Sequence, residues 1–135
     1  MPDEPLPPRQ ARCVFVYGTL RAGGANDIRR LHPAPQWVGA AHVSGDLYHL
    51  GAYPGLLLRA GGSPVVGEVY QMDPALEPVL DAIEGLLGPC ATDEYVKREV
   101  AVPCNGAVVR CLVYEINPRY VANAACIVHG DWMKA

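Results

Sequence analysis

Short apolar runs, broken by glycine and proline, follow one another along most of the chain. The residues from Cys13 to Tyr17 are apolar or aromatic, and the run stops at Gly18. This pattern predicts a buried strand that ends in a glycine turn. The segment from Trp37 to Leu58 predicts a series of short strands, and Val65 to Met72 predicts another. The glycines that divide the first of these two segments are Gly39, Gly45, Gly51 and Gly55.

The clearest helix signal begins at Asp73-Pro74. A carboxylate at the N-cap accepts hydrogen bonds from unpaired N–H groups, and proline suits the first helical position. The apolar stripe that follows at the helical period consists of Leu76, Val79, Leu80, Ile83 and Leu87. Gly85 and then Gly88-Pro89 predict the end of this helix. Residues 26–32 predict a second, shorter helix that begins at Asp27 or at the residue before it.

Asn105-Gly106 is the strongest signal for a two-residue hairpin turn in the chain. It joins the runs 95–104 and 107–116, so position 97 pairs with 114 and position 100 with 111. One face of this hairpin then carries Tyr95, Lys97, Leu112 and Tyr114, and a more apolar face carries Val96, Val100, Val102, Val109, Cys111 and Val113. Arg98 falls on the more apolar face, so we expect either a partner carboxylate there or a bulge that shifts the register.

About six strands and one clear helix, without regular alternation, predict an α+β domain rather than a doubly wound sheet. We expect a mixed, barrel-like β-sheet with a helix packed against it. A chain of 135 residues fits one domain. Residues 1–11 hold four of the 13 prolines and no apolar period. They predict a flexible arm that precedes a single domain at 12–135.

The charge balance argues against several classes of partner. The chain has 11 Lys and Arg against 14 Asp and Glu, a formal net charge of −3, and no run of like charges is longer than two residues. We therefore expect neither a nucleic acid nor an anionic membrane as partner. No apolar run approaches the length of a membrane span, and the acidic, proline-rich start lacks the features of a secretory signal. These features predict a cytoplasmic protein.

The five cysteines, at positions 13, 90, 104, 111 and 126, form no C-x-x-C pair, and the four histidines are scattered. An odd cysteine count in a chain without a secretory signal predicts reduced thiols rather than a disulfide framework. No cysteine and histidine cluster has the spacing of zinc ligands, so no metal site is predicted.

The segment Tyr17-Gly18-Thr19-Leu20-Arg21 is a candidate binding loop. A strand that ends in a glycine turn leaves several N–H groups unpaired, and these groups can form a small anion-binding nest. Short glycine turns are common, so the residues alone favour a simple turn. Tyr95 and Tyr114 either line a polar pocket or pack across the strands, and the residues alone favour packing. Tyr53-Pro54-Gly55 is most simply a turn.

Glu84 is the acidic residue with the strongest claim to a catalytic role. On a helical wheel it lies beside Leu80 at the edge of the apolar stripe, whereas Glu77 and Asp81 point further toward water. Partial burial at this edge would raise its pKa toward that of a useful general base. The residues alone favour an ordinary solvated glutamate near a helix end.

Taken together, the order and spacing of these motifs resemble the γ-glutamylcyclotransferase-like superfamily, in particular its short bacterial branch and the related γ-glutamylamine cyclotransferases. The resemblance covers about residues 13 to 133. The segments that carry it are VFVYGTLR at 14–21, GDLYHLGAYPGLL at 45–57, VVGEVYQMD at 65–73, LDAIEG at 80–85, EYVKREV at 94–100 and LVYEI at 112–116. YGTL and LD-x-x-EG in this order are specific together, although either alone is weak.

The resemblance implies a closed mixed β-barrel flanked by helices, and an enzyme that needs no cofactor. The implied reaction releases 5-oxoproline and a free amine from a small-molecule γ-glutamyl substrate. Carried over by position, Glu84 is implied as the general base and acid. The backbone of Gly18, Thr19 and Leu20 is implied to hold the glutamyl carboxylate or the carbonyl oxygen. The side chains implied to line the pocket are Tyr17, Tyr95 and Tyr114.

The sequence leaves alternatives open. The protein is an enzyme acting on γ-glutamyl amines, a non-catalytic small-molecule-binding protein on the same fold, or a biosynthetic enzyme that removes a γ-glutamyl protecting group from an amino-sugar product. The YGTLR loop differs from the YGS-type loop of glutathione-specific relatives, so glutathione is not the expected substrate. Glu68 is the fallback base if Glu84 is exposed, and Arg21 either meets an acidic group or is solvated. We expect a monomer, with Trp132 packing the C-terminus onto the barrel.

Overall fold

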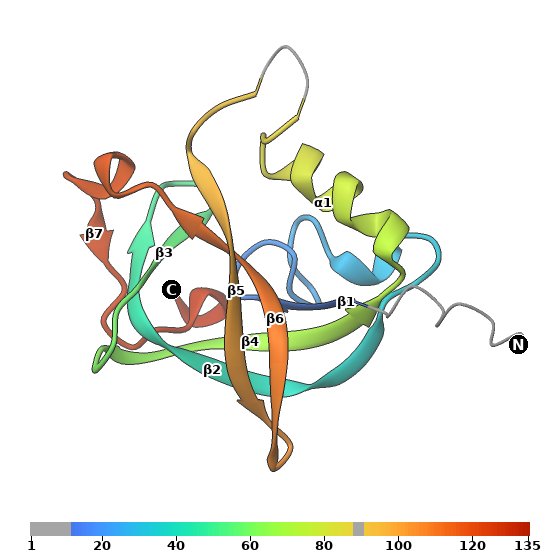
Figure 1. Cartoon of the computed structure of the whole chain (residues 1–135). Coiled ribbons are helices and arrows are strands. Elements are labelled where there is room, and N and C mark those ends of the chain that lie inside the picture. The colour runs from blue at the N-terminus through green and yellow to red at the C-terminus, as the bar shows by residue number, and fades with distance from the viewer. Residues whose placement is uncertain (1–11, 88–90) are drawn as a thin grey trace, which may run out of the picture.

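The computed structural model describes residues 12–87 and 91–135. Within them a mixed β-sheet curls around an apolar core, and one α-helix packs beside it (Figure 1). Three of the predicted features lie outside the described residues, namely the arm at 1–11, the helix stop at Gly88-Pro89 and the thiol of Cys90.

Seven strands make up the sheet. They are β1 (Arg12–Val16), β2 (Gln36–His49), β3 (Pro54–Leu58), β4 (Ser63–Met72), β5 (Tyr95–Cys104), β6 (Ala107–Ile116) and β7 (Ala125–Cys126). Six of them follow the hydrogen-bonded order β3-β2-β4-β1-β6-β5, and β7 pairs with β2. β1 and β6 run parallel, and the other pairings are antiparallel. The predicted α+β class with a mixed sheet is confirmed.

The sheet forms a half-barrel rather than the closed barrel that the resemblance implies. β3 and β5 are the end strands of the hydrogen-bonded order, and they do not pair with each other within the described residues. The curl brings β5 close to β2 and β6 close to β3 (Figure 1). The turns and strand ends at one side of this curl are therefore free to frame a pocket.

One long strand replaces the first of the short strands predicted from residue 37 onward. β2 runs for 14 residues, and the register shift at Gly39 does not interrupt it. A Cβ atom at Gly45 would lie 2.3 Å from the carbonyl oxygen of Leu57, so this glycine lets β3 approach closely. Gly39 lies at a bulge, and Gly45 lies where two strands approach closely. A glycine in either position looks, in the sequence, like a glycine that ends a strand.

β5 and β6 form the predicted hairpin in the predicted register from one end to the other. Asn105 (φ 54°) and Gly106 (φ 78°) both have positive φ, as a two-residue type I′ turn requires. The guanidinium of Arg98 contacts the carboxylate of Glu115, with Nε 3.0 Å from Oε1. Of the two alternatives for Arg98, the partner carboxylate is therefore the right one.

The helix predicted after Asp73 is confirmed. The carboxylate of Asp73 accepts a hydrogen bond from the N–H of Ala75 at 2.8 Å. A short 3₁₀ helix, Pro74–Leu76, then leads into α1 (Glu77–Ile83). Gly85 follows with φ +74°, a conformation that stops an α-helix and favours glycine. The sequence therefore placed both ends of this helix within a few residues.

The buried face of α1 differs from the predicted stripe. Leu80 is fully buried as predicted. Three other members of the stripe are exposed, namely Val79, Ile83 and Leu87. Asp81, predicted to face water, is instead buried. Its carboxylate accepts hydrogen bonds from the hydroxyl of Tyr114 at 2.7 Å and from Nζ of Lys97 at 3.0 Å. These two donors compensate the loss of water around the carboxylate, so the helix turns this side toward the sheet.

Three more short 3₁₀ helices complete the fold. The segment 26–32, predicted as a helix, contains one at Ile28–Arg30, and Asp27 caps it. The other two are Pro118–Val121 and Trp132–Lys134. Trp132 packs against the apolar core, and its ring centroid lies 5.1 Å from that of His49. The prediction that Trp132 packs the C-terminus onto the sheet is confirmed.

Two apolar clusters pack against the two faces of β1. Val14 and Val16 contribute to the cluster that also contains Leu80 of α1. Phe15, between them, contributes to a second cluster with Val69 and Val113 of β4 and β6. Alternate side chains of a strand point to opposite faces, so β1 is held from both sides. The loop that follows β1 therefore starts from a fixed position.

The four cysteines within the described residues are free thiols. Cys104 and Cys111 are buried on β5 and β6. Burial, with a smaller contribution from Cys13 and Cys104, raises the pKa of the Cys111 thiol to about 12. A thiol that stays protonated at neutral pH is a poor nucleophile, so Cys111 belongs to the core rather than to a reactive site.

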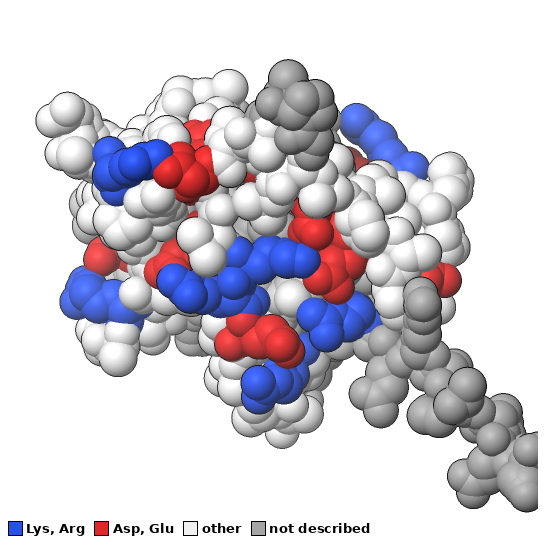
Figure 2. Space-filling model, turned by 45° about the horizontal axis from the view of Figure 1, so that its top comes forward, with Lys and Arg blue, Asp and Glu red and all other residues white. Residues whose placement is uncertain are grey.

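Charged side chains of both signs are mixed on the surface. Figure 2 shows Lys and Arg next to Asp and Glu across one face of the molecule. The surface ion pairs include Arg59 with Asp46, whose closest atoms are 2.8 Å apart. This face therefore has no extended field of one sign. None of the helices in the described part of the chain is long and apolar enough to cross a membrane.

Candidate active site

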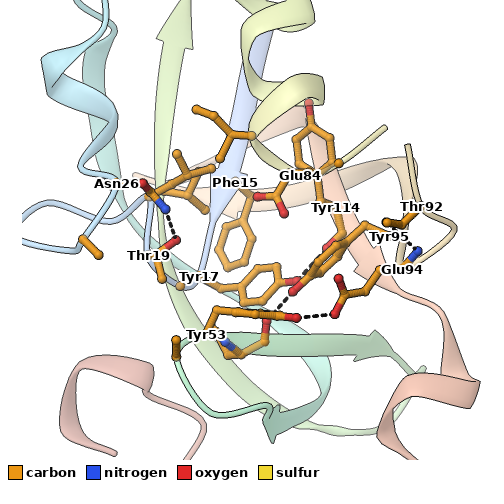
Figure 3. Close-up of a pocket in the computed structure, with 18 residues that line it drawn as sticks. Phe15, Tyr17, Thr19, Asn26, Tyr53, Glu84, Thr92, Glu94, Tyr95 and Tyr114 are labelled. Carbon is orange, nitrogen blue, oxygen red and sulfur yellow. Dashed lines mark hydrogen bonds between the residues drawn. The ribbon is translucent and has the colours of Figure 1, made fainter. Parts of the chain in front are cut away.

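A cavity of about 350 Å³ lies where the end of β1, the end of α1 and strands β5 and β6 meet. Segments far apart in the sequence line it, and Figure 3 shows their side chains converging. The seven site residues implied by the resemblance all line this cavity: Tyr17, Gly18, Thr19, Leu20, Glu84, Tyr95 and Tyr114. The structure thus brings these seven residues together in one place.

Glu84 lies directly after α1, where its N–H still bonds to the carbonyl of Leu80 at 2.9 Å. Its side chain is partly buried and points into the cavity (Figure 3). No hydrogen-bond or ion-pair partner for this carboxylate lies within residues 12–87 and 91–135. Burial, and secondly the negative charge of Glu94, raises the pKa of Glu84 to about 7. A carboxyl group in this range both accepts and returns a proton at neutral pH.

The loop Gly18–Leu20 lines the cavity, and its backbone N–H groups are free within the described part of the chain. Its carbonyls are occupied, since those of Gly18, Thr19 and Leu20 accept from the N–H groups of Arg21, Asn26 and Ile28 at 3.0, 2.9 and 2.9 Å. The three N–H groups of the loop donate to no acceptor in the described residues. Consecutive free N–H groups of this kind suit a carboxylate or an oxyanion. The loop geometry is therefore compatible with the anion-binding nest, because its three N–H groups are not used within the loop itself.

Gly18 is required by close packing. A Cβ atom at this position would lie 2.6 Å from Cγ of Pro54. Real Cβ contacts are longer, so a larger residue would push the loop away from the β3 end of the cavity. A side-chain hydrogen bond also holds the loop, because Nδ2 of Asn26 donates to Oγ1 of Thr19 at 3.1 Å.

The three predicted tyrosines contribute rings rather than free hydroxyls. Tyr17 donates to the carbonyl of Tyr114 at 2.6 Å, and Tyr95 donates to the carbonyl of Pro54 at 2.7 Å. The hydroxyl of Tyr114 donates to Asp81. Burial raises the pKa of all three phenols, so they stay neutral. The structure thus gives these side chains a wall-forming role and uses their hydroxyls to fix the wall in place.

Two further residues of the cavity were missed by the sequence analysis. Tyr53, interpreted only as part of a turn, donates a hydrogen bond to Oε2 of Glu94. This bond, then burial, raises the pKa of Tyr53 to about 12. The position of Glu94 directly before Tyr95, at the start of the hairpin, was the only sequence signal that placed Glu94 near the site. No sequence signal indicated that Tyr53 and Glu94, 41 positions apart, form a pair.

Glu68 and Arg21 form a separate network beside the cavity. Glu68 is buried and accepts from Nε of Arg21 at 3.0 Å, from the N–H of Ala22 at 2.9 Å and from the hydroxyl of Tyr70 at 2.9 Å. Arg21 also donates to Asp131 at 2.8 Å. Of the two alternatives, Arg21 therefore meets acidic groups. Glu68 does not line the cavity, and its oxygens are occupied, so the geometry does not favour it as a base.

These observations define a class of molecule: a small α+β half-barrel whose cavity is lined, within the described residues, by an unpaired acid and by a loop with free backbone N–H groups. The family described as gamma-glutamyl cyclotransferase, AIG2-like, matches residues 14–134, and the chain belongs to it. This membership confirms the expected superfamily and the expected enzyme type at the level of the family.

Named relatives agree with this assignment. The gamma-glutamylcyclotransferase family protein YtfP of Escherichia coli K12 is 33% identical over 127 residues, which cover 89% of this chain and 95% of that protein. A gamma-L-glutamyl-butirosin B gamma-glutamyl cyclotransferase of Niallia circulans is 35% identical over 86 residues, or 63% of this chain and 53% of that one. The crystal structure of a mouse AIG2-like protein shares the fold, with a TM-score of 0.68, 24% identity and 84% coverage of both chains.

Proposed function

We propose that the protein is a γ-glutamyl cyclotransferase that releases 5-oxoproline and a free amine from γ-glutamyl amines, with Glu84 as general base and acid. The observation that carries this proposal is the unpaired carboxylate of Glu84 in the cavity, whose pKa of about 7 suits proton transfer at neutral pH. The free N–H groups of Gly18–Leu20 at the same cavity support it. Family membership supports the reaction class.

In this reaction the substrate carries its own nucleophile. The α-amine of the γ-glutamyl group folds back onto the side-chain carbonyl carbon and closes a five-membered ring. A pocket that holds the group in this folded shape supplies much of the rate, because the reacting atoms are already close. A protein nucleophile is therefore not needed.

The proton path uses one carboxylate twice. Glu84 takes a proton from the α-ammonium group, and the freed nitrogen forms a bond to the carbonyl carbon. The carbonyl electrons move onto oxygen, where the N–H groups of Gly18–Leu20 stabilise the charge. Glu84 returns the proton to the leaving nitrogen, and the bond between this carbon and that nitrogen breaks. Glu84 then takes the remaining extra proton from the ring nitrogen and passes it to the released amine, so the products are the neutral lactam and an ammonium group. No electron is transferred to or from the substrate, so the chemistry calls for no redox cofactor.

The test is 5-oxoproline release from a panel of γ-glutamyl amines by the wild type and by Glu84→Gln. Glutamine keeps the size of the side chain and removes the base. We expect wild-type turnover that falls at least about a hundredfold in the variant, the usual range for loss of a general base. Glu99→Gln is the matched control, because Glu99 is exposed and forms a surface pair with Arg110.

Two results would overturn the proposal. Activity that survives Glu84→Gln would remove Glu84 from the mechanism. No turnover of any conjugate by the wild type, together with binding of 5-oxoproline, would support a non-catalytic binding protein on the same fold. Thermal unfolding of each variant shows whether a loss of activity is a loss of folding.

A biosynthetic version of the same chemistry is the second candidate. The protein would then remove a γ-glutamyl protecting group from an amino-sugar product. The Niallia circulans relative favours this candidate, because its name gives γ-L-glutamyl-butirosin B as the compound it acts on. A γ-glutamyl amino sugar therefore belongs in the panel, and a preference for it over simple alkylamine conjugates would decide for this version.

A further inference from the structure

Glu94 is a second carboxylate at the cavity, and the proposed reaction does not use it. Its side chain is partly buried among the lining residues. The hydroxyl of Tyr53 donates to Oε2 and holds the group in place, while Oε1 has no hydrogen-bond partner within the described residues. Glu94 therefore presents one fixed, unused acceptor oxygen beside the cavity.

The charge of the cavity wall is one-sided. Glu84 and Glu94 are its ionisable acids, and no Lys, Arg or His is among the described lining residues. Arg21, at the end of the binding loop, is turned away toward Glu68 and Asp131. A ligand group that reaches Glu94 thus meets negative charge without a compensating cation. Such a wall attracts a cationic group and repels an anionic one.

The positions of the two carboxylates suggest which half of the substrate each one meets. In Figure 3, Thr19 and Asn26 lie on one side of Glu84, and Thr92 and Glu94 lie on the other. A γ-glutamyl group held by the loop Gly18–Leu20, with its carbonyl near Glu84, directs its amine half away from Thr19. That direction leads toward Glu94.

We propose that Glu94, oriented by Tyr53, binds a positively charged group on the amine half of the substrate, so that the preferred substrates are γ-glutamyl conjugates of amines with a second, cationic nitrogen. This inference rests on the proposed function and names its substrate class. The cavity volume of about 350 Å³ suits a short chain of this kind, because it lies at the small end of the roughly 300–1,000 Å³ typical of ligand pockets.

The test compares three γ-glutamyl conjugates of similar length that differ in the charge of the far end. The cationic one contains 1,4-diaminobutane, the neutral one contains pentylamine, and the anionic one contains 4-aminobutanoate. Wild type, Glu94→Gln and the control Glu99→Gln are assayed for 5-oxoproline release. In wild type we expect kcat/KM to be at least about tenfold higher for the cationic conjugate than for the neutral one, and lowest for the anionic one.

The variant should remove this preference selectively. Glu94→Gln is expected to raise KM for the cationic conjugate about tenfold, and to change KM for the neutral conjugate much less. Glu99→Gln should keep the wild-type order. An equal loss on all three conjugates would overturn the inference, because Glu94 would then contact the shared glutamyl group or serve only the structure. Equal wild-type rates on the three conjugates would overturn it as well.

Failure of the proposed function is distinguishable from failure of this inference. Turnover of the neutral conjugate tests the reaction itself, and the ratio between conjugates tests Glu94. If no conjugate is turned over, calorimetric affinities of the three conjugates for the wild type still decide, since the cationic one must bind most tightly. The wild-type order needs no variant, so the inference stays testable even if Glu94→Gln does not fold.

Discussion

The hydroxyl of Tyr17 donates a 2.6 Å hydrogen bond to the backbone carbonyl of Tyr114, a residue 97 positions away in the sequence. The same oxygen accepts from the N–H of Leu56 at 3.3 Å. One buried phenol therefore links the end of β1 to β6 and to β3. The cavity lies between these elements, so the link fixes the relative position of its walls.

Tyr17→Phe should destabilise the protein. The change removes one oxygen and leaves the buried carbonyl of Tyr114 and the N–H of Leu56 without this partner, which costs about 1–3 kcal/mol. Urea unfolding followed by circular dichroism measures the loss. Tyr48→Phe is the control, because no described residue bonds to the Tyr48 hydroxyl, and about 0.5 kcal/mol or less is expected there. Equal losses in the two variants would contradict a special role for the Tyr17 hydroxyl.

The sequence predicted those parts of the fold whose conformation depends on residues adjacent in the chain. Asn105-Gly106 sets the hairpin turn, because both residues tolerate positive φ, and the turn then fixes the register of β5 and β6. Asp73-Pro74 sets the helix start in the same local way. The unbroken β2 was missed, because a glycine at a close approach between strands looks like a strand end in the sequence.

The parts of the site that were missed depend on distant pairs. Asp81 faces the sheet because Tyr114, 33 positions later, donates to it. Tyr53 and Glu94 are partners across 41 positions, and neither residue has a local pattern that announces the other. The helical wheel made Glu84 a candidate, but only the resemblance favoured it as the base, since its surroundings come from several separate segments of the chain. Burial and partners of single side chains are properties of the tertiary structure.

The rate of the proposed reaction should rise with pH. Glu84 acts as a base only when it is ionised, and burial holds its pKa at about 7, so kcat/KM for the neutral conjugate should increase through an apparent pKa near 7. The charge of Glu94 is the second cause of this shift. Glu94→Gln should therefore move the ascending limb to lower pH. A pH–rate profile of both proteins checks this, and an unchanged limb in the variant would contradict the coupling.

Glu84→Gln should change stability in a pH-dependent way. The folded-state pKa of about 7 lies above the ordinary glutamate pKa of 4.5, so the folded state favours the protonated group. Its full stability contribution is present below pH 4.5 and is lost as the pH rises through 7. The variant should match wild type near pH 4 and exceed it by about 1–3 kcal/mol at pH 8. Urea unfolding at both pH values measures the difference, and a variant less stable than wild type at pH 8 would contradict the burial of this charge.

Arg21 should support both the fold and substrate binding. Its side chain is only 11% exposed and joins Glu68 at 3.0 Å and Asp131 at 2.8 Å. Arg21→Ala leaves two largely buried carboxylates without their cation, and we expect a loss of about 3 kcal/mol. Arg59→Ala, which breaks an exposed pair with Asp46, should cost about 1 kcal/mol or less.

The effect of Arg21→Ala on KM shows whether Arg21 holds the loop Gly18–Leu20 in place or only stabilises the fold. Arg21 directly follows the loop Gly18–Leu20, and its ties to Glu68 and Asp131 hold the end of that loop. At a temperature where Arg21→Ala is fully folded, we expect KM to rise severalfold, because the N–H groups that receive the glutamyl group lose their fixed position. Arg21→Lys keeps the charge and should recover part of the loss. A wild-type KM in folded Arg21→Ala would show that the loop holds its shape without this network.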